Sequence, residues 1–468
     1  MPNLDLEFVA QTLNLPAPAH NAAIGRVLID SRQAQTGDLF VALTGENRDG
    51  HDFVADVLSR GAFALVSRDD CTGLSGCLAV PDTLAALQTL AAAWRREVNP
   101  QVFGITGSSG KTTVKEMLAA VLRAKFGADA VLATAGNFNN HIGLPLTLLA
   151  LRDTHRYAVI EMGMNHAGEL AALTRIARPD AALVNNAQRA HVGCGFDGTA
   201  DIARAKSEIY QGLPHGGSGK PLQSGHGTAL VPIEDAHAGI FQAACAALGV
   251  NTQTFGIERG DIHAQNIVLQ PFESTFDLVC GSETASVVLP APGRHNVANA
   301  CAAAALALQA GVPLPEIAAG LARFANIKGR LQRKAGIRNS LIIDDSYNAN
   351  PDSMKAAIDV LAALPAPRVF VMGDMGELGD DEAGAMHAEI GAYARDKGIE
   401  AAYFVGDYSV EAAETFGADG LWFAAKDPLI QVITHVLPEN ASVLVKGSRF
   451  MEMEEVAAEL TDPELQHD

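Results

Sequence analysis

The chain has 468 residues, of which 48% are hydrophobic and 19% are charged, a composition typical of a globular protein with large buried cores. At roughly 100–200 residues per domain, this length predicts two to four domains. The net charge of −20 opposes binding to nucleic acid or anionic membranes, and no apolar run reaches the ~20 residues that span a bilayer.

The N-terminal segment "MPNLDLEFVAQTLNLP" has neither a basic start nor the apolar core of a signal peptide. The six cysteines are scattered, and none forms a Cys-x-x-Cys pair. These features predict a cytoplasmic protein without structural disulfides or a zinc site.

The first predicted block covers residues 1–97. It holds short strand-like runs, "LFVAL" at 39–43 and "FALVS" at 63–67, each followed by helical periodicity. An alanine-rich helical stretch ends the block, and Pro100 with the change to "VFGITG" indicates a boundary.

The second block, residues 98–328, alternates apolar runs such as "VFGIT", "YAVIEM" and "AALVNN" with helical stretches. Strand–helix alternation predicts a parallel sheet with helices on both faces. Residues 262–290 change to short alternating strands, which indicates a small antiparallel excursion.

The third block, residues 329–468, contains four strands that end in polar loops: "SLIIDDSYNANPDS", "RVFVMGDMGELGD", "AAYFVGD" and "SVLVKGSR". The pattern predicts another open α/β sheet, whose ligands bind beyond the carboxyl ends of the strands. This rule places six polar residues near a binding crevice: Asp345, Asn348, Asp374, Glu377, Lys446 and Arg449.

A phosphate-binding motif opens the second block. "GITGSSGKT" at 104–112 fits G-x-x-x-x-G-K-[ST], follows an apolar strand and opens a helix, which is the context the motif requires. Lys111 is expected to reach the terminal phosphates, and the Thr112 hydroxyl to ligate Mg²⁺. The residues predicted to bind the nucleotide are Gly107, Ser108, Ser109, Gly110, Lys111, Thr112 and Thr113.

Three further residues are candidates for the metal site. Glu161 follows the strand "YAVIE", where P-loop proteins carry an acidic metal ligand, although a strand-capping surface glutamate is the alternative. His191 and Lys206 come after the strand "AALV", and a structural histidine is as plausible as a ligand. No Asn-Lys-x-Asp motif is present, which favours ATP over GTP.

"PGRHNVANA" at 292–300 is the next distinctive stretch. The amide of Asn296 can pair with the donor and acceptor edge of adenine. From spacing alone, Asn296 fits equally well as a plain helix N-cap.

These motifs in this order resemble the Mur ligase family of peptidoglycan synthesis. The resemblance spans residues 106–455 and rests on "TGSSGKTT", "AGNFNNHIGLPLTLL", "IEMGMNHAGEL", "AHVGCGF", "ARAKSEI", "PGRHNVANA", "KGRL", "DDSYNANPDSM", "VMGDMGELG" and "VKGSRFMEMEE". It implies an α/β protein of three domains: an N-terminal UDP-binding domain (1–97), a central P-loop ATPase (98–328) and a Rossmann-like C-terminal domain (329–468).

Three of these stretches, "EMGMNHAGEL", "DDSYNANPDSM" and "GDMGELG", are similar to family members that join D-alanyl-D-alanine to UDP-N-acetylmuramoyl-tripeptide. "DSRQAQTGDLFVALTGENRDGHDF" is similar to their UDP-recognition domain. The family chemistry implies that ATP phosphorylates a peptide carboxylate and that an amine then attacks the acyl phosphate. The third residue of the tripeptide, lysine or diaminopimelate, stays open.

The resemblance also implies residue roles. Lys111 contacts the ATP phosphates, and a site for two Mg²⁺ ions is formed by Thr112, Glu161, His191 and a carbamylated Lys206. Asn296, Arg330 and Asp345 contact the nucleotide. Residues expected at the other substrates are Ser31 and Arg32 for UDP, Asn137, Asn139 and Asn140 for the UDP-sugar, Tyr347, Asn348, Asn350 and Ser353 for the dipeptide, and Lys446, Ser448 and Arg449 for a carboxylate.

The chain departs from the family pattern at two places. It reads "HVGCGFDG" where relatives often read His-Leu-Glu-Gly-Phe-Gly, and "LVPIEDAH" where they often carry an Asn-x-Asp-Asp turn. Three alternatives compete with the dipeptide ligase. They are a family member that adds one amino acid, which typically carries Asp-Asn-Pro-Arg; folylpolyglutamate synthetase, which lacks a domain like 1–97; and a nucleotide-gated binding protein that makes no amide. A monomer is expected.

Overall fold

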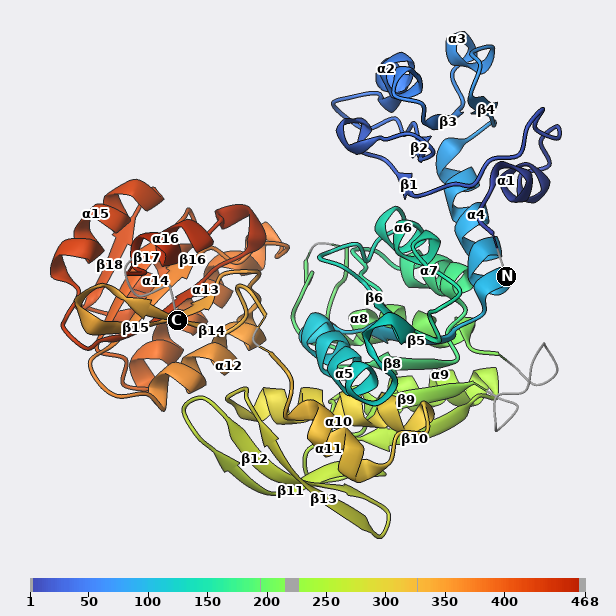
Figure 1. The fold of residues 1–468 in the computed structure, drawn as a ribbon. Helices are drawn as coiled ribbons and strands as arrows, with labels where there is room; N and C mark the ends of the chain where they lie inside the picture. The colour runs from blue at the N-terminus through green and yellow to red at the C-terminus, as the bar shows by residue number, and fades with distance from the viewer. Residues whose placement is uncertain (1–2, 194, 215–226, 326, 463–468) are drawn as a thin grey trace.

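The computed structural model describes residues 3–193, 195–214, 227–325 and 327–462, and their strands form three sheets (Figure 1). The first is a parallel sheet in the order β1-β2-β3-β4. Its strands are β1 (Val27–Leu28), β2 (Leu39–Val41), β3 (Phe63–Val66) and β4 (Cys77–Ala79). Its helices are α1 (Leu6–Thr12), α2 (Val54–Ser59), α3 (Asp69–Thr72) and α4 (Thr83–Val98).

Helix α4 joins the first sheet to the second. It starts where the Asp82 side chain accepts a hydrogen bond from the backbone of Ala85, and it ends at Asn99 in the left-handed region. Its apolar face belongs to one continuous core that includes both the first sheet and the helices beside the second sheet. The buried Trp94 donates from Nε1 to the carbonyl of Leu151 at 3.1 Å. This junction is therefore an extension of the hydrophobic core.

The central sheet has nine strands in the order β13-β12-β11-β10-β9-β8-β5-β7-β6. The strands are β5 (Gln101–Thr106), β6 (Val131–Ala133), β7 (Tyr157–Glu161), β8 (Ala181–Val184), β9 (Thr228–Pro232), β10 (Asn251–Phe255), β11 (Ile262–Leu269), β12 (Ser274–Cys280) and β13 (Glu283–Leu289). β11, β12 and β13 pair antiparallel, which confirms the excursion predicted for residues 262–290.

Successive residues of β5 point to opposite faces of this sheet, as strand geometry requires. Val102 joins the core that α4 enters, and Phe103 joins a second core on the other face. The helices of this part are α5 (Lys111–Phe126), α6 (Gly143–Leu149), α7 (Glu169–Ala177), α8 (Thr199–Ser207), α9 (Ala238–Leu248), α10 (Arg294–Gln309) and α11 (Leu314–Leu321). The sheet is thus covered on both faces.

The third sheet has the order β14-β15-β19-β16-β17-β18, with only β14 antiparallel to its neighbour. Its strands are β14 (Gln332–Gly336), β15 (Ser340–Asp345), β16 (Arg368–Gly373), β17 (Ala401–Val405), β18 (Gly420–Phe423) and β19 (Ser442–Lys446). Its helices are α12 (Pro351–Ala362), α13 (Asp380–Asp396), α14 (Ser409–Phe416), α15 (Lys426–Val436) and α16 (Glu454–Glu459). Three α/β units with largely parallel sheets confirm the predicted fold class. None of the helices in the described ranges is both long and apolar enough to cross a membrane.

Candidate functional site

A cavity of about 900 Å³ lies where the carboxyl ends of the central and third sheets face each other. Loops after β5, β7 and β8 form one wall, and loops after β15, β16 and β19 form the other. The predicted residues that line it are Ser108, Ser109, Gly110, Lys111, Thr112, Thr113, Asn137, Asn139, Asn140, Glu161, His191, Asn296, Arg330, Asp345, Tyr347, Asn348, Asn350, Ser353, Lys446 and Arg449. Gly107, Lys206, Ser448, Ser31 and Arg32 lie outside its lining.

The P-loop forms the turn between β5 and α5, and residues directly after β8 contact it. Gly110 has φ +78°, and a Cβ there would lie 2.5 Å from Asn185 Nδ2, so a side chain would be both strained and obstructed. The side-chain oxygen of Asn186 accepts from the Ser109 backbone N–H at 2.9 Å. Sequence reasoning missed both asparagines, because a polar residue after a strand gives no sign of which loop it supports.

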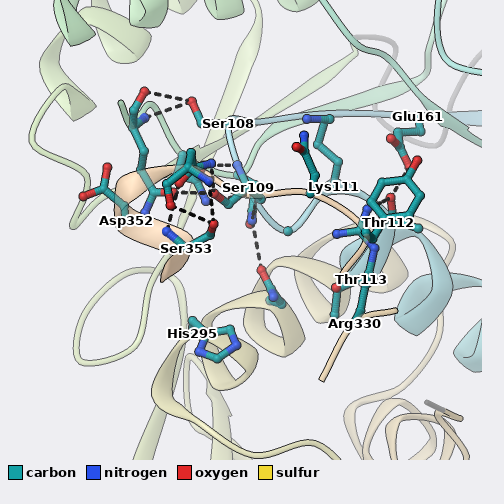
Figure 2. Close-up of a pocket in the computed structure, with 18 of the residues that line it drawn as sticks. Ser108, Ser109, Lys111, Thr112, Thr113, Glu161, His295, Arg330, Asp352 and Ser353 are labelled. Carbon is teal, nitrogen blue, oxygen red and sulfur yellow. Dashed lines mark hydrogen bonds between the residues drawn. The ribbon is translucent and has the colours of Figure 1, made fainter. Parts of the chain in front are cut away.

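The central polar contacts of the cavity are made by Thr112. Its hydroxyl donates to Glu161 Oε2 at 2.9 Å and accepts from Arg330 Nη2 at 3.0 Å, and Figure 2 shows Thr112 between these two side chains. Arg330 Nε is buried and has no hydrogen-bond partner within the described ranges. A buried unpaired donor costs about 1–3 kcal/mol, so this atom is suited to an incoming acceptor.

Glu161 is held in place from several directions. It is 2% exposed and also accepts from Asn139 Nδ2 at 2.8 Å. Its backbone N–H donates to the Thr134 hydroxyl at 3.0 Å, and the Thr134 carbonyl accepts from the buried Lys115 Nζ at 2.6 Å. The alternative of a surface strand cap is therefore wrong: this carboxylate is buried and directed into the cavity.

Lys206 on α8 is fully buried next to other basic side chains. Burial and the charge of Lys111 lower the pKa of Lys206 well below its usual range. Burial, together with Lys206 and Lys111, also lowers the pKa of His191 to about 4, so its imidazole is neutral at neutral pH. Within the described part of the chain, Lys206 Nζ forms no hydrogen bond and no ion pair, which is unusual for a buried lysine.

The residues present fit a magnesium ion bound with nucleotide phosphates. Mg²⁺ prefers hard oxygen ligands and usually takes one or two protein carboxylates together with phosphates and waters. The Thr112 hydroxyl and the Glu161 carboxylate supply such oxygens, and a cationic group, the Arg330 guanidinium, already contacts the hydroxyl. No cluster of three His, Cys, Asp or Glu side chains suited to a metal occurs among the described residues.

The opposite wall is built by the third sheet. Asp345 Oδ2 accepts from Lys446 Nζ at 2.5 Å, and Asp345 Oδ1 accepts from the Leu331 backbone at 3.0 Å. Asn350 and Ser353 form a capping box at the start of α12, and Asn350 Nδ2 donates to Ser109 Oγ at 3.2 Å. These residues thus have structural contacts beside the substrate roles predicted for them.

The two walls are also connected by charged side chains. Arg189, in the loop after β8, donates to Asp352 Oδ1 at 2.8 Å and to Glu389 Oε2 at 2.7 Å. Three residues further on, the Val192 carbonyl accepts from the Gly379 N–H at 2.9 Å. The junction between the central and third sheets is therefore polar. The sequence did not indicate that Arg189 would connect the two sheets.

One alternative and one prediction from the sequence need correction. Asn296 is not the N-cap of α10: the cap is Gly293 at φ +91°, and the Asn296 amide lies inside the helix and donates to the Pro292 carbonyl at 2.8 Å. Asp374 does not line the cavity, because it is buried and accepts from Ser409 and Tyr408 instead. Glu377, on the same loop, does line the cavity, as the strand-end rule predicts.

The predicted UDP residues lie away from this cavity. Ser31 and Arg32 form the 3-10 helix Ser31–Gln33 of the first unit, and the exposed Arg32 pairs with Asp30 at 2.8 Å. Hydrogen bonds from Arg32 hold the pKa of Asp30 below its usual range. A smaller cavity of about 310 Å³ lies between the first unit and the start of α6, with lining residues that include Thr44, Asp82 and His141.

Comparison with known proteins explains this arrangement. Three family models match in succession: the Mur ligase family catalytic domain over residues 23–95, the Mur ligase middle domain over 105–307, and the Mur ligase glutamate ligase domain over 329–449. A curated relative from Escherichia coli, the UDP-N-acetylmuramoyl-tripeptide–D-alanyl-D-alanine ligase, is 41% identical over 99% of both chains. The chain belongs to the Mur ligase family.

Solved structures agree with this membership. MurF from Acinetobacter baumannii has a TM-score of 0.87 at 37% identity, covering 98% of this chain and 99% of that one. MurF ligase from Thermotoga maritima in complex with ADP has a TM-score of 0.79 at 25% identity, covering 93% and 96%. This Mur ligase is an ATP-dependent ligase, and its family generally uses ATP with Mg²⁺.

Proposed function

We propose that this Mur ligase joins D-alanyl-D-alanine to UDP-N-acetylmuramoyl-tripeptide, giving the UDP-muramoyl-pentapeptide of peptidoglycan synthesis. The observation that carries the proposal is one cavity in which a P-loop faces the strand ends of a second sheet, with Arg330 reaching across to Thr112. The relatives that match nearly the whole chain carry this activity in their names.

The proposed reaction has two steps. The terminal carboxylate of the UDP-linked peptide attacks the γ-phosphorus of ATP, releasing ADP and forming an acyl phosphate. The amino group of the dipeptide then attacks the carbonyl carbon, and the tetrahedral intermediate expels phosphate as the amide forms and the amine loses its proton. Phosphorylation is needed because a carboxylate oxygen is a poor leaving group and phosphate is a good one.

The nucleotide and metal roles fall to the central domain, residues 98–328. Backbone N–H groups of Gly107–Thr113 surround the phosphates, and Lys111 and Arg330 neutralise their charge. Thr112, Glu161 and His191 hold Mg²⁺, which supplies electrostatic stabilisation of the transferred phosphoryl group. Asn296 forms hydrogen bonds with adenine, and Asp345 contacts the ribose.

Lys206 is proposed to react with carbon dioxide. Its neutral amine adds to the carbon of CO₂ and loses a proton, which gives an anionic carbamate on Nζ. The support for this is its complete burial beside Lys111, with no hydrogen bond or ion pair to its Nζ in the described ranges, where a cationic ammonium would be costly even with the Glu377 carboxylate nearby. The carbamate would complete the donor set for a second Mg²⁺.

The remaining roles divide between the outer domains. Residues 1–97 bind UDP through Ser31 and Arg32, and Asn137, Asn139 and Asn140 face the UDP-sugar. The C-terminal domain, residues 329–468, binds the dipeptide at the loops that contain Tyr347, Asn348, Asn350, Ser353, Lys446, Ser448 and Arg449. We propose further that the protein is a cytoplasmic monomer.

The proposal is tested by phosphate release with ATP and UDP-N-acetylmuramoyl-tripeptide, comparing D-alanyl-D-alanine with single amino acids. Release that depends on the dipeptide is the expected result. Release with a single amino acid would instead indicate the single-residue ligase, and ATP binding without acceptor-dependent release would indicate a binding protein. Tripeptides carrying lysine or diaminopimelate, compared in the same assay, identify the third residue.

Replacing Arg32 by alanine is expected to raise the KM for the UDP substrate by about 10- to 100-fold, the range for losing a hydrogen bond to a charged group. The KM for ATP should not change, because Arg32 lies outside the nucleotide cavity. Arg68→Ala, which removes an arginine paired with Asp52 and Asp70 in the same unit, is the matched control. An equal loss of affinity for both substrates would contradict the UDP assignment.

A further inference from the structure

Glu377 differs from every other carboxylate that lines the main cavity. Across the described residues, the remaining acidic side chains there each accept at least one hydrogen bond: Glu161, Glu169, Glu234, Asp235, Asp345 and Asp352. Glu377 accepts none, and it contacts His191 Nδ1 at 3.4 Å. Half of its side chain (51%) is exposed, and the residue lines the cavity.

The loop that carries Glu377 is held rigidly. The Met375 N–H donates to His387 Nε2 at 2.9 Å, and the Gly376 N–H donates to Ser448 Oγ at 2.6 Å. Glu377 itself has φ +60°, a left-handed conformation that is unfavourable for this residue type. A strained residue between anchored neighbours indicates that the loop serves to place this side chain.

The loop that carries the negatively charged Glu377 is hydrogen-bonded to the loop that carries the positively charged Arg449. The Ser448 hydroxyl that accepts from Gly376 belongs to the loop after β19, and the next residue, Arg449, also lines the cavity. The Ser448 N–H donates to the Asp374 carbonyl at 3.0 Å, which fixes the two loops to each other twice. Arg449 pairs with Glu454 through one nitrogen, and the guanidinium has further donors available.

We propose that Glu377 binds the α-ammonium group of the acceptor dipeptide, while Arg449 receives its carboxylate. An ammonium carries three donors and no acceptor, which matches a carboxylate whose oxygens have no donor of their own. An extended dipeptide spans roughly 7 Å, and the loops that carry Glu377 and Arg449 are hydrogen-bonded to each other through Gly376 and Ser448. Glu377 also lies near Lys111 and His191, so the amine is held on the side of the cavity where the acyl phosphate forms.

This inference rests on the proposed function, and its test uses binding in place of turnover. The whole enzyme, loaded with a non-hydrolysable ATP analogue and the UDP-tripeptide, is titrated by calorimetry with D-alanyl-D-alanine and with D-lactoyl-D-alanine. The second ligand replaces the amine by a hydroxyl and keeps the carbon skeleton. We expect the wild type to prefer the amine by about 10- to 100-fold, the range for a charge-assisted hydrogen bond.

In Glu377→Gln this preference should fall to nearly equal affinities, and in Glu382→Gln it should persist, since Glu382 does not line the cavity. Glu377→Asn, a residue type that tolerates the left-handed region, is a second variant if the glutamine substitution unfolds the loop. An unchanged preference in a folded Glu377 variant overturns the inference, as does a shifted Mg²⁺ requirement with normal dipeptide affinity.

The two proposals fail in different ways. If the wild type releases phosphate with the dipeptide but Glu377→Gln keeps the amine preference, only the role of Glu377 is wrong. If the wild type neither binds nor turns over the dipeptide, the proposed function is wrong and this inference is overturned with it. For Arg449→Gln, the expected loss is the preference for the dipeptide over its C-terminal amide, with the amine preference retained.

Discussion

Replacing Lys206 by alanine is expected to lower kcat/KM by about 10²- to 10³-fold, the loss that follows removal of one preorganised electrostatic group. The proposed carbamate is then absent, and a small cavity is left beside Lys111. Short-chain carboxylic acids such as formate or acetate should restore part of the rate, because their carboxylate can occupy the position of the carbamate. The measurement is phosphate release as a function of acid concentration.

Lys115 offers a matched control for this experiment. It is also a buried lysine, 1% exposed, but its Nζ donates to the Thr134 carbonyl and it does not line the cavity. Lys115→Ala is expected to lose thermal stability and to show no rescue by carboxylic acids. A wild-type rate in Lys206→Ala, or equal rescue of both variants, would exclude a carbamate at Lys206.

Replacing Glu161 by alanine should raise the Mg²⁺ concentration needed for half-maximal activity by at least about 10- to 100-fold. This is the effect of losing a residue that only orients a metal ligand, and Glu161 is proposed to be a ligand itself. The carboxylate is buried and contacts the Thr112 hydroxyl, so its removal takes away one proposed ligand and the hydrogen bond that orients the other. Asn139 Nδ2 also loses its acceptor, and a lower melting temperature should accompany the kinetic effect.

The control is Glu169→Ala. Glu169 lines the same cavity but accepts from the Asn165 backbone and contacts His166, and in the described residues it forms no hydrogen bond with Thr112. Its Mg²⁺ titration should match that of the wild type. If Glu161→Ala gave the same Mg²⁺ curve as the wild type, the carboxylate would have only a structural role.

Short stretches of neighbouring residues were sufficient to predict the P-loop and the position of Glu161 at the end of a strand. The P-loop motif needs only neighbouring residues, and Glu161 is placed at the same sheet edge because parallel strands share one polarity. The same rule predicts that Glu377 faces the crevice. It fails for Asp374, three residues earlier, because the rule does not distinguish a side chain that points into the cavity from one that caps α14 through Ser409.

Contacts between distant segments were the part that sequence reasoning missed. Arg189 meets Asp352 and Glu389, which lie 163 and 200 residues further along the chain. No periodicity or motif records such a pairing, because it depends on how two separately folded sheets approach each other. The wrong N-cap alternative for Asn296 has a local cause: Gly293 at φ +91° starts the helix earlier than the asparagine.

The contact between the first and central sheets is apolar, and the contact between the central and third sheets is charged. Dissolved salt is therefore expected to change the stability of these two contacts in opposite directions. Ion pairs such as those of Arg189 weaken as the Debye length shortens, from about 10 Å at 0.1 M to about 3 Å at 1 M ionic strength. The buried face of α4 gains stability in sulfate or phosphate, which strengthen apolar association. The apolar contact between the first two units is therefore expected to persist at high ionic strength, whereas the ion pairs between the central and third sheets are expected to weaken.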